Sequence, residues 1–552
     1  MLPQHSSVII AGGGPCGLML ANELGRRGIG AILVDAKPGT AFSPQANATQ
    51  ARTMEHYRRL GFADEVRSLG LPPDFPTDIA YFTRFAKYEL ARFSLPSARE
   101  AKTMVASLSG SWSAAELPHR VSQKFVEQVL RKHAEALPGI SVNYGWRMID
   151  FRDTGPGVEV DVERVDGGER QTLSADYLVA ADGPRSLVRN RFEFRWTGET
   201  GVVRDFFGGR MYAIYVNAPD FYRVVPHAPA WMNVTFNRER RAFMATVDGK
   251  GQFAFHTQLR AHEDETRVTL DDARAMFRQG VGAELPVEVL SCDTWTAGHA
   301  LVAEHFQRGR VFLGGDAVHL FTPAGGLGYN TAIEDAVNIG WKLAAVLKGW
   351  ASPHLLDSYE AERKPLAVRN TGYAKRFAES LGNYEPVPEI EEAGEAGEAA
   401  RAVAGKYLEA HGRSEFNIPG VTFGGRYDGS PAIVSDGTSP PPDAANQYVP
   451  SACPGGRPPH LWFPDGTSLY DRFGFEFTLL RLGPNPPDAS AFIQAARRAD
   501  MELKIVDVSS QEARDLYGAD LALIRPDQIV GWRGNDASQA EYVLARTTGR
   551  QI

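Results

Sequence analysis

Glycines spaced for a phosphate-binding turn lie near the N-terminus. Residues 8–11 form an apolar run typical of a buried parallel strand, and Gly12, Gly14 and Gly17 follow it with the spacing G-x-G-x-x-G, which encloses Pro15. In such a turn the first glycine allows the bend, the second lets backbone approach a pyrophosphate, and the third lets a helix pack on the strand. The helix expected over residues 18–27 directs unpaired N–H groups at the phosphates.

An acidic residue ends the second predicted strand. Residues 31–34 are apolar, and Asp35 follows them about 20 residues after the glycine turn, where a carboxylate binds a ribose hydroxyl. A glycine-rich turn alone is weak evidence of a ligand. Strand, turn, helix, second strand and terminal acid together predict a dinucleotide site.

Two later segments repeat the pattern of a buried strand that ends in glycine and an acid. They are Asp182-Gly183 and Gly315-Asp316. Ligands bind at the carboxyl ends of parallel strands, so we expect all three segments at one edge of a sheet, although an isolated Asp-Gly is usually a simple turn. Residues 325–328 precede a long predicted helix and offer a second helix N-terminus to a ligand oxygen, unless they form only a flexible loop.

Composition narrows the function classes. The 552 residues suffice for two to four domains, and the net charge of −8 does not favour nucleic-acid or anionic-membrane binding. We expect no membrane span, no signal peptide and a cytoplasmic location. The three cysteines (Cys16, Cys292, Cys453) are too far apart in sequence for a redox pair, a disulfide framework or a metal site.

The pattern of elements indicates how the chain is organised. Residues 158–162 and 171–173 predict an antiparallel meander, and residues 176–180 a separate buried strand. The aromatic-rich residues 211–216, 231–236 and 241–247 predict neighbouring strands of one sheet, which either packs a core or forms the wall of an apolar cavity. Residues 475–532 predict strand, helix, strand, helix and two strands, typical of a small α/β domain.

The three motifs, in this order, resemble the class A FAD-dependent aromatic hydroxylases, of the para-hydroxybenzoate, phenol and polyketide hydroxylase kind. The glycine turn is similar to the family's FAD fingerprint, residues 182–189 to its Asp-Gly motif and residues 314–319 to its Gly-Asp motif. Residues 323–330 resemble the loop against the flavin ring, and Arg120 and Gln123 fall where the family places FAD-contacting side chains. Gln45 stands where many members have an arginine, which bears on how the nicotinamide cofactor is handled.

The resemblance implies an α/β fold: a Rossmann-type FAD-binding domain, an inserted mixed-sheet substrate domain and a thioredoxin-like C-terminal domain. The expected parts are the FAD-binding domain at residues 1–75, 118–190 and 296–385, the substrate domain at 76–117 and 191–295, a linker or loose solvated helix at 386–410, and the thioredoxin-like domain at 411–552. The last domain has no C-x-x-C, which implies a structural or oligomerising role and a homodimer.

The resemblance also implies the reaction. FAD is reduced by NADPH or NADH, O₂ adds to give a flavin C4a-hydroperoxide, and one oxygen atom goes to a phenolic or polyketide-type substrate. A dry apolar cavity and a base for the phenol are expected. The alternatives are a flavin-dependent halogenase, whose Trp-x-Trp-x-x-Pro is absent, another FAD oxidoreductase, and a non-catalytic FAD-binding scaffold.

The candidate site residues fall into four sets, two of which overlap, and no metal is expected. The flavin-ring loop contributes Pro323, Gly325 and Gly326. The cofactor-binding residues are Gly12, Gly14, Pro15, Gly17, Asp35, Arg120, Gln123, Asp182, Gly183, Gly315, Asp316, Gly328 and Asn330. Tyr215, Met232 and His227 are the substrate candidates. Tyr212, Tyr215, His227 and His256 are candidates for the base, although each fits a structural role as well.

Overall fold

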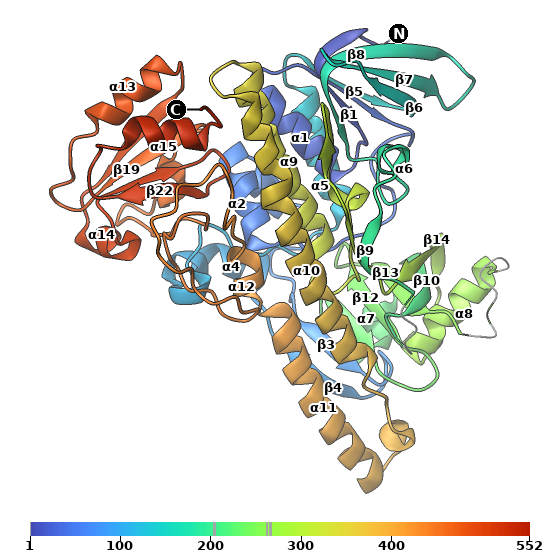
Figure 1. Cartoon of the computed structure of the whole chain (residues 1–552). Coiled ribbons are helices and arrows are strands. Elements are labelled where there is room, and N and C mark those ends of the chain that lie inside the picture. The colour runs from blue at the N-terminus through green and yellow to red at the C-terminus, as the bar shows by residue number, and fades with distance from the viewer. Residues whose placement is uncertain (1, 202–205, 261–262, 264–267, 552) are drawn as a thin grey trace.

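The computed structural model describes residues 2–201, 206–260, 263 and 268–551 and is a mixed α/β structure (Figure 1). Its largest sheet contains the glycine turn and has the strand order β16-β17-β8-β1-β2-β5, with β6 and β7 extending from β8 as an antiparallel arm. The strands are β1 (His5–Ala11), β2 (Ala31–Asp35), β5 (Ile140–Tyr144), β6 (Trp146–Asp153), β7 (Val158–Arg164), β8 (Arg170–Ala180), β16 (Gln307–Arg308) and β17 (Val311–Leu313). β1 is parallel to β2 and β8, and β17 is parallel to β8. The expected Rossmann-type core is therefore present.

The meander differs from the expectation at one strand. The sequence predicts two strands at residues 171–173 and 176–180, but β8 runs through both. Its first half pairs antiparallel with β7 and its second half pairs parallel with β1, because no glycine or proline interrupts the chain between the two halves.

Helices cover this sheet and join its strands. α1 (Pro15–Arg26) packs against α5 (Gln123–Glu135) and against the long helix α9 (Leu327–Leu347). α2 (Ala51–Leu60) ends at Gly61, whose left-handed conformation (φ +84°) closes the helix. The short α6 (Leu187–Arg191) follows β8 directly.

The second sheet has the order β14-β10-β13-β12-β11-β3-β4. Its strands are β3 (Ile79–Phe82), β4 (Glu89–Phe93), β10 (Gly209–Asn217), β11 (Met232–Thr235), β12 (Ala242–Thr246), β13 (Gln252–Gln258) and β14 (Glu288–Ala297). The three predicted strands do share this sheet, but β13 separates β10 from β12, so not all three are direct neighbours. Phe255 on one face packs against α8 (Leu270–Val281), while Ala254 and His256 alternate to the other.

The segment expected to be a linker or a loose solvated helix is largely helical in the structure. A short 3-10 turn, η5 (Pro388–Glu391), precedes α11 (Glu395–Phe416), whose glutamates and alanines are good helix formers. α11 packs on β4: a Cβ at Gly405 would lie 2.3 Å from the carbonyl oxygen of Leu90. The glycine that suggests a loose linker is what lets the helix approach the strand.

The C-terminal part is an α/β unit of four strands in the order β20-β19-β21-β22. It contains β19 (Phe477–Leu482), α13 (Ser490–Arg498), β20 (Leu503–Val508), α14 (Gln511–Tyr517), β21 (Leu521–Ile524), β22 (Val530–Gly534) and α15 (Ala540–Thr547). The predicted strand and helix order is confirmed, and α15 is an addition. α13 and α15 share one hydrophobic cluster, whereas Tyr517 of α14 lies in another (Figure 1).

A fully buried cluster of charges attaches this unit to the rest of the chain. Arg525 donates to Glu362 of α10 (Ser358–Gly382) at 2.6 and 2.9 Å and to Asp527 at 2.7 Å. Lys342 of α9 donates to Glu362 at 2.6 Å, and burial lowers the pKa of Lys342 to about 8. Each of these charges is buried with a partner, so removal of one leaves the others uncompensated.

Arg525→Ala is expected to lower the free energy of unfolding by about 3–5 kcal/mol, because it leaves the buried Asp527 carboxylate without its cation and Glu362 with Lys342 alone. Denaturant unfolding of the purified protein measures this. The matched control is Arg498→Ala in the same unit, which removes an ion pair with Glu541 whose side chains are 58% and 70% exposed. That control should change stability by less than about 1 kcal/mol, and equal losses in both variants would contradict the importance of burial.

Candidate functional site

The glycine turn joins β1 to α1 and is shaped by two close approaches. Gly12 has φ +115°, and a Cβ there would lie 2.0 Å from the carbonyl oxygen of Ala181, while a Cβ at Gly17 would lie 1.9 Å from that of Gly12. Within the described part of the chain, a Cβ at Gly14 would meet no atom within 4 Å, and no side chain caps α1, which begins at Pro15. The turn thus leaves a helix N-terminus facing open space, which fits a pyrophosphate.

Asp35 lies beside this turn at the end of β2. Its carboxylate accepts hydrogen bonds from the N–H groups of Gly13 (2.6 Å) and Lys37 (2.7 Å). The Tyr144 hydroxyl donates to the carbonyl of Gly13 at 2.9 Å. Asp35 therefore holds the turn in shape and stays half-buried at the position where a ribose hydroxyl is expected.

The Asp-Gly segment supplies a carboxylate oxygen that is not fully used. Oδ2 of Asp182 accepts from the N–H of Leu187 at 2.8 Å, but Oδ1 is buried without a hydrogen-bond partner among the described residues. Burial raises the pKa of Asp182. A buried acceptor left unpaired is costly, so this atom fits a ligand hydroxyl. Gly183 follows with φ +80°, and no described atom lies within 4 Å of a Cβ built on it.

Arg189, which follows this motif, is committed to the protein itself. Its guanidinium donates to the carbonyls of Ala317 (2.9 Å) and Pro184 (2.8 Å) and lies over the Trp196 ring. It therefore ties the Asp-Gly segment to the Gly-Asp segment.

The Gly-Asp segment is held from behind by a buried aspartate that belongs to none of the three motifs. Asp335 of α9 accepts from the N–H of Gly315 (3.0 Å), contacts Nε2 of His319 (2.7 Å) and accepts from Arg363 (2.8 Å). The Asp316 side chain is exposed, and desolvation by the surrounding protein raises its pKa. Asp316 is free to meet a cofactor while Asp335 carries the turn.

The loop of residues 323–328 is clamped at its two left-handed glycines, Gly325 and Gly326. Gln50 donates from Nε2 to the carbonyl of Gly325 at 2.8 Å, and its N–H donates to Oδ1 of Asn330 at 2.8 Å. Asn330 donates to the carbonyls of Ala48 (3.0 Å) and Gly326 (2.6 Å). Asn330 thus acts here as a tether of the loop.

Gly328 is packed against Phe321, whose ring lies 3.3 Å from a Cβ built there. Pro323 precedes the clamp, and neighbouring Ala324 and Leu327 lie in the hydrophobic cluster that also contains the edge of the second sheet.

Arg120 is a buried cation with no carboxylate partner among the described residues. It is 7% exposed, its guanidinium lies 4.5 Å from the centre of the Trp231 ring, and burial lowers its pKa to about 10. Gln123 donates from its backbone to the carbonyl of Ala46 (2.7 Å) and from its side chain to Glu127 (2.7 Å). Arg120 can therefore receive an anionic or electron-rich group, whereas Gln123 orders the neighbouring loop.

The second sheet turns an apolar face with two unpaired polar groups toward the loop. Phe243, Met232 and Trp295 pack on the cluster that contains Ala324 and Leu327. His256 stacks on Phe243 with ring centres 4.6 Å apart and meets Trp295 edge-on at 5.9 Å. Nδ1 of His256 and Nε1 of Trp295 are buried without partners among the described residues. One acceptor and one donor thus lie unpaired in an apolar wall.

The four base and substrate tyrosines and histidines separate onto the two faces. Tyr215 lies on the same face of the sheet as Ala254 and His256. Its hydroxyl accepts a hydrogen bond from Lys124 (3.0 Å) and donates one to Gln252. Tyr212 packs in the cluster on the opposite face. The His227 ring lies against Phe82 of that same opposite face, with ring centres 5.1 Å apart, and so lies on the side of the sheet away from His256. The sequence indicates His256 only as one of four candidates for the base, and it does not identify Trp295, Gln50 or Asp335, which carry no local signal.

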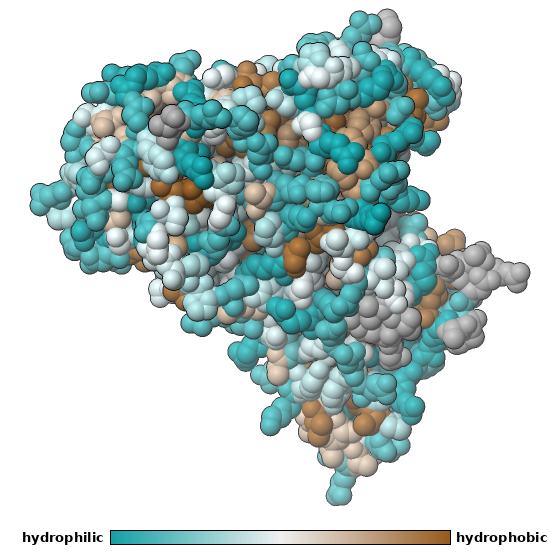
Figure 2. Space-filling view, in the orientation of Figure 1, coloured by the Kyte–Doolittle hydropathy of each residue, from teal (hydrophilic) through white to brown (hydrophobic). Residues whose placement is uncertain are grey.

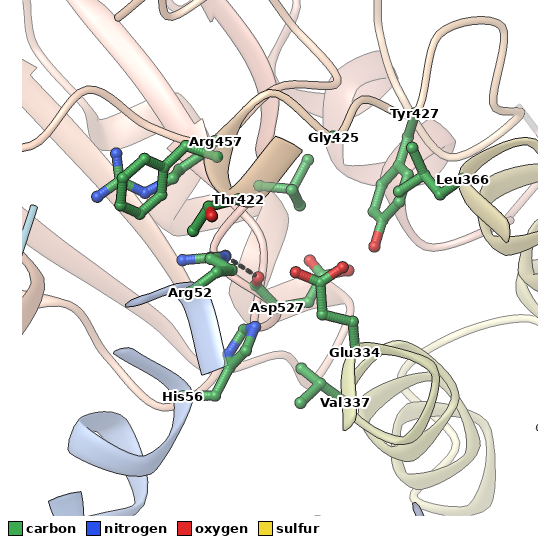
Figure 3. Close-up of a pocket in the computed structure, with 12 residues that line it drawn as sticks. Arg52, His56, Glu334, Val337, Leu366, Thr422, Gly425, Tyr427, Arg457 and Asp527 are labelled. Carbon is green, nitrogen blue, oxygen red and sulfur yellow. Dashed lines mark hydrogen bonds between the residues drawn. The ribbon is translucent and has the colours of Figure 1, made fainter. Parts of the chain in front are cut away.

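A small polar cavity of about 20 Å³ lies apart from these groups, where α2, α9 and the C-terminal unit meet. Figure 3 shows Arg52, His56 and Glu334 around it, with Arg52 bonded to the carbonyl of Asp527 at 2.9 Å. Burial and nearby arginines lower the pKa of His56 well below its usual value. The cavity has room for about one water molecule and belongs to the docking of the C-terminal unit.

Gly14→Ala is expected to weaken FAD binding by about tenfold or more while the apoprotein keeps its stability, because the new methyl enters only the open space before the helix. FAD titration and thermal unfolding of the apoprotein measure the two effects. Gly372→Ala, within helix α10, is the matched control and should leave FAD affinity unchanged. Unaltered affinity in Gly14→Ala would argue against a phosphate at this turn.

Comparisons with known proteins agree with this geometry. Residues 5–373 match the family model described as FAD binding domain, and residues 451–550 match that of the aromatic-ring hydroxylase C-terminal domain. The phenol 2-monooxygenase of Pseudomonas sp. (strain EST1001) is 30% identical over 96% of this chain and 90% of its own length.

Two solved structures extend the similarity to the whole fold. The rebeccamycin biosynthetic enzyme RebC with reduced flavin is 30% identical with a TM-score of 0.87, and aklavinone-11 hydroxylase in complex with FAD and aklavinone is 26% identical with a TM-score of 0.82. Each match covers 100% of both chains. The FAD model spans more than half of the chain, and the orphaned Asp182 oxygen and the open turn at Gly14 fit that cofactor. This chain is an enzyme that belongs to the class A FAD-dependent aromatic hydroxylases.

Proposed function

We propose that this hydroxylase uses NADPH or NADH and O₂ to hydroxylate a phenolic substrate, multi-ring polyketide-type phenols included, bound between residues 323–328 and the apolar face of the second sheet. The observation that carries the proposal is the unpaired nitrogen pair of His256 and Trp295 in that face. Membership of the family makes flavin-dependent aromatic hydroxylation the reaction class. Membership of the family does not by itself define the substrate or the roles of individual residues, and these are proposed here.

The residues of the first sheet bind and orient the cofactor. FAD, when bound, supplies hydride acceptance from the nicotinamide and activation of O₂. In the proposal Gly12, Gly14 and Gly17 receive the pyrophosphate, Asp35 a ribose hydroxyl, and Asp182 and Asp316 the remaining hydroxyls. Gly315 and Gly183 permit the turns that aim these carboxylates. Arg120 offers a buried cation that no described carboxylate neutralises.

His256 and Trp295 suit a phenol hydroxyl because the hydroxyl both donates and accepts. The Trp295 N–H donates to the phenol oxygen, and a ring nitrogen of His256 accepts the phenol proton in a hydrogen bond. Burial lowers the pKa of His256 to about 4, so the ring is neutral and able to accept at neutral pH. A hydrogen bond to this proton places electron density on the ring and makes it a better nucleophile.

The surroundings of this pair keep water out. Phe243 stacks on His256, and Phe206 and Phe207 pack beside Phe243. Met232 extends the same apolar surface toward the loop. Excluding water protects the activated oxygen from wasteful release and strengthens the polar contacts within.

In the proposal, small side chains near His256 allow a substrate larger than a single ring. Ala245 and Ala254 are paired across β12 and β13, and Ala213 of β10 is paired with His256, so three alanines lie on the same part of this sheet. Among the relatives, one is named for phenol and another binds aklavinone. We propose a substrate with more than one ring for this chain.

One experiment tests the reaction. FAD-loaded enzyme is mixed with NADPH or NADH and a panel of phenols, and nicotinamide loss, O₂ uptake and product mass are followed. Acceleration of flavin reduction by a phenol and a product heavier by one oxygen atom are expected. A chloride-dependent product would favour the halogenase alternative, and failure of every phenol to accelerate reduction would sink the hydroxylase proposal.

The location and assembly are further parts of the proposal. No helix in the described ranges is both long and apolar enough to cross a membrane, and we propose a cytoplasmic enzyme. A homodimer is supported by apolar surface near the start of α11, where Val387 and Val403 are 46% and 66% exposed, at the lower tip of Figure 2. The four-stranded C-terminal unit supports the thioredoxin-like assignment in a structural role.

His256→Phe is expected to lower kcat/KM for hydroxylation by about 10- to 100-fold, because loss of the acceptor leaves the phenol hydroxyl and the Trp295 N–H poorly satisfied. FAD affinity should not change. Product formation at varied substrate concentration measures the effect. His227→Phe, on the opposite face, is the matched control and should retain full activity. Equal activity of both variants would remove His256 from the site.

A further inference from the structure

Helix α11 reaches the flavin-ring loop with a buried carboxylate. Oε1 of Glu415 accepts a hydrogen bond from the N–H of Gly325 at 2.9 Å, and Glu415 is only 7% exposed. Gln50 holds the carbonyl of the same glycine from the other side. Gly325 is therefore fixed through both of its backbone groups, and one of the two anchors, Glu415, lies outside residues 5–373, which match the FAD-binding model.

A second side chain of α11 supports Glu415. Nε2 of His411 lies 2.8 Å from Oε2 of Glu415. Nδ1 of His411 lies 3.0 Å from the Ser380 hydroxyl of α10, and its ring meets Tyr81 edge-on. His411 is buried as well, at 3% exposed. Glu415 is thus held in one orientation between two helices and β3.

We propose that Glu415 is a positioning residue that fixes the flavin-ring loop through Gly325, and that its buried negative charge lowers the reduction potential of the bound flavin. The inference rests on the proposed function only in placing residues 323–328 beside the flavin. A carboxylate in a poorly solvated interior acts on nearby charge far more strongly than one in water. Reduction adds electrons to the flavin, so a fixed negative charge opposes it.

The arrangement also bears on the backbone donors of the loop. The N–H of Gly325 points to α11 and is already bonded, so it is not available to a reduced flavin in this conformation. Among the described residues, this hydrogen bond joins the flavin-ring loop to α11. We therefore expect a displacement of α11 to move the loop.

Two substitutions separate the bond from the charge. Glu415→Gln keeps an acceptor oxygen for Gly325 but removes the charge, whereas Glu415→Ala removes both. We expect Glu415→Gln to shift the flavin midpoint potential to a more positive value with FAD affinity and loop protection near those of the wild type. We expect Glu415→Ala to speed hydrogen exchange at the Gly325 amide and to weaken FAD binding severalfold.

The measurements are redox titration of the FAD-loaded protein and hydrogen exchange of the peptide that covers residues 320–330. Glu409→Gln is the matched control, since Glu409 lies on the same helix but is 56% exposed and 3.6 Å from Arg413. It should change neither the potential nor the exchange. An unchanged potential in Glu415→Gln would overturn the electrostatic role, and unchanged exchange in Glu415→Ala would overturn the positioning role. Should Glu415→Ala fail to fold, Glu415→Asp, which shortens the side chain, gives the exchange result.

The tests of Glu415 do not depend on whether the enzyme hydroxylates a phenol. If no phenol is hydroxylated by the wild type, the proposed function fails, while the potential and the exchange of the FAD-loaded protein still decide this inference. If the wild type hydroxylates a phenol and neither variant differs from it, the inference alone fails.

Discussion

The parallel register of β2, β1, β8 and β17 is the constraint on which the rest of the site depends. Ala11 pairs with Val34 and Ala180, and Ala180 pairs with Leu313, so the four strands end on one line. The residues that follow are therefore brought to one edge: Gly12, Asp35, Asp182 and Gly315. Gly12 is required because β8 comes so close that a Cβ would strike Ala181. A shift of one strand would separate the glycine turn from its carboxylates.

Helix α9 connects this edge of the first sheet to the flavin-ring loop and to the C-terminal unit. Its buried polar residues follow one another along the helix, and each serves a different neighbour. Asn330 tethers the flavin-ring loop, Asp335 holds the Gly-Asp turn, and Lys342 meets the charge cluster of the C-terminal unit. Buried polar groups on a helix are tolerated only when paired, so the loop, the turn and the C-terminal unit must be in place together. The C-terminal unit is thereby attached to the same helix as the flavin-ring loop and the Gly-Asp turn.

The two sheets contribute different kinds of surface to the site. The first exposes carboxylates and helix ends to a charged cofactor, and its specificity lies in backbone geometry. The second offers a flat face whose alternating residues place Ala254 and His256 on one side and Phe255 on the other. In the proposed function, the two unpaired nitrogens of this apolar wall bind an oxygen that can both donate and accept. Glu415 links the flavin-ring loop to α11.

The cofactor-binding part can be read from the amino-acid sequence because its signals are local. Strand, glycine turn, helix and terminal acid must be adjacent in the chain to work, so Gly12, Asp35, Asp182 and Asp316 are all identifiable from the order of residues. The element order of the C-terminal unit is likewise readable from its hydrophobic pattern. The α/β class follows from these elements.

Which side chains meet across the chain, in contrast, depends on tertiary packing. Strand alternation does not say which face is the cavity side, so the sequence does not distinguish His227 from His256, and the fold places them on opposite faces. The composition of residues 386–410 suggests a linker, because glycine is usually a sign of a flexible chain. In the structure Gly405 instead allows α11 to pack closely on β4. The bond between Glu415 and Gly325 joins residues 90 positions apart, and such contacts follow from burial and register, which no local pattern encodes.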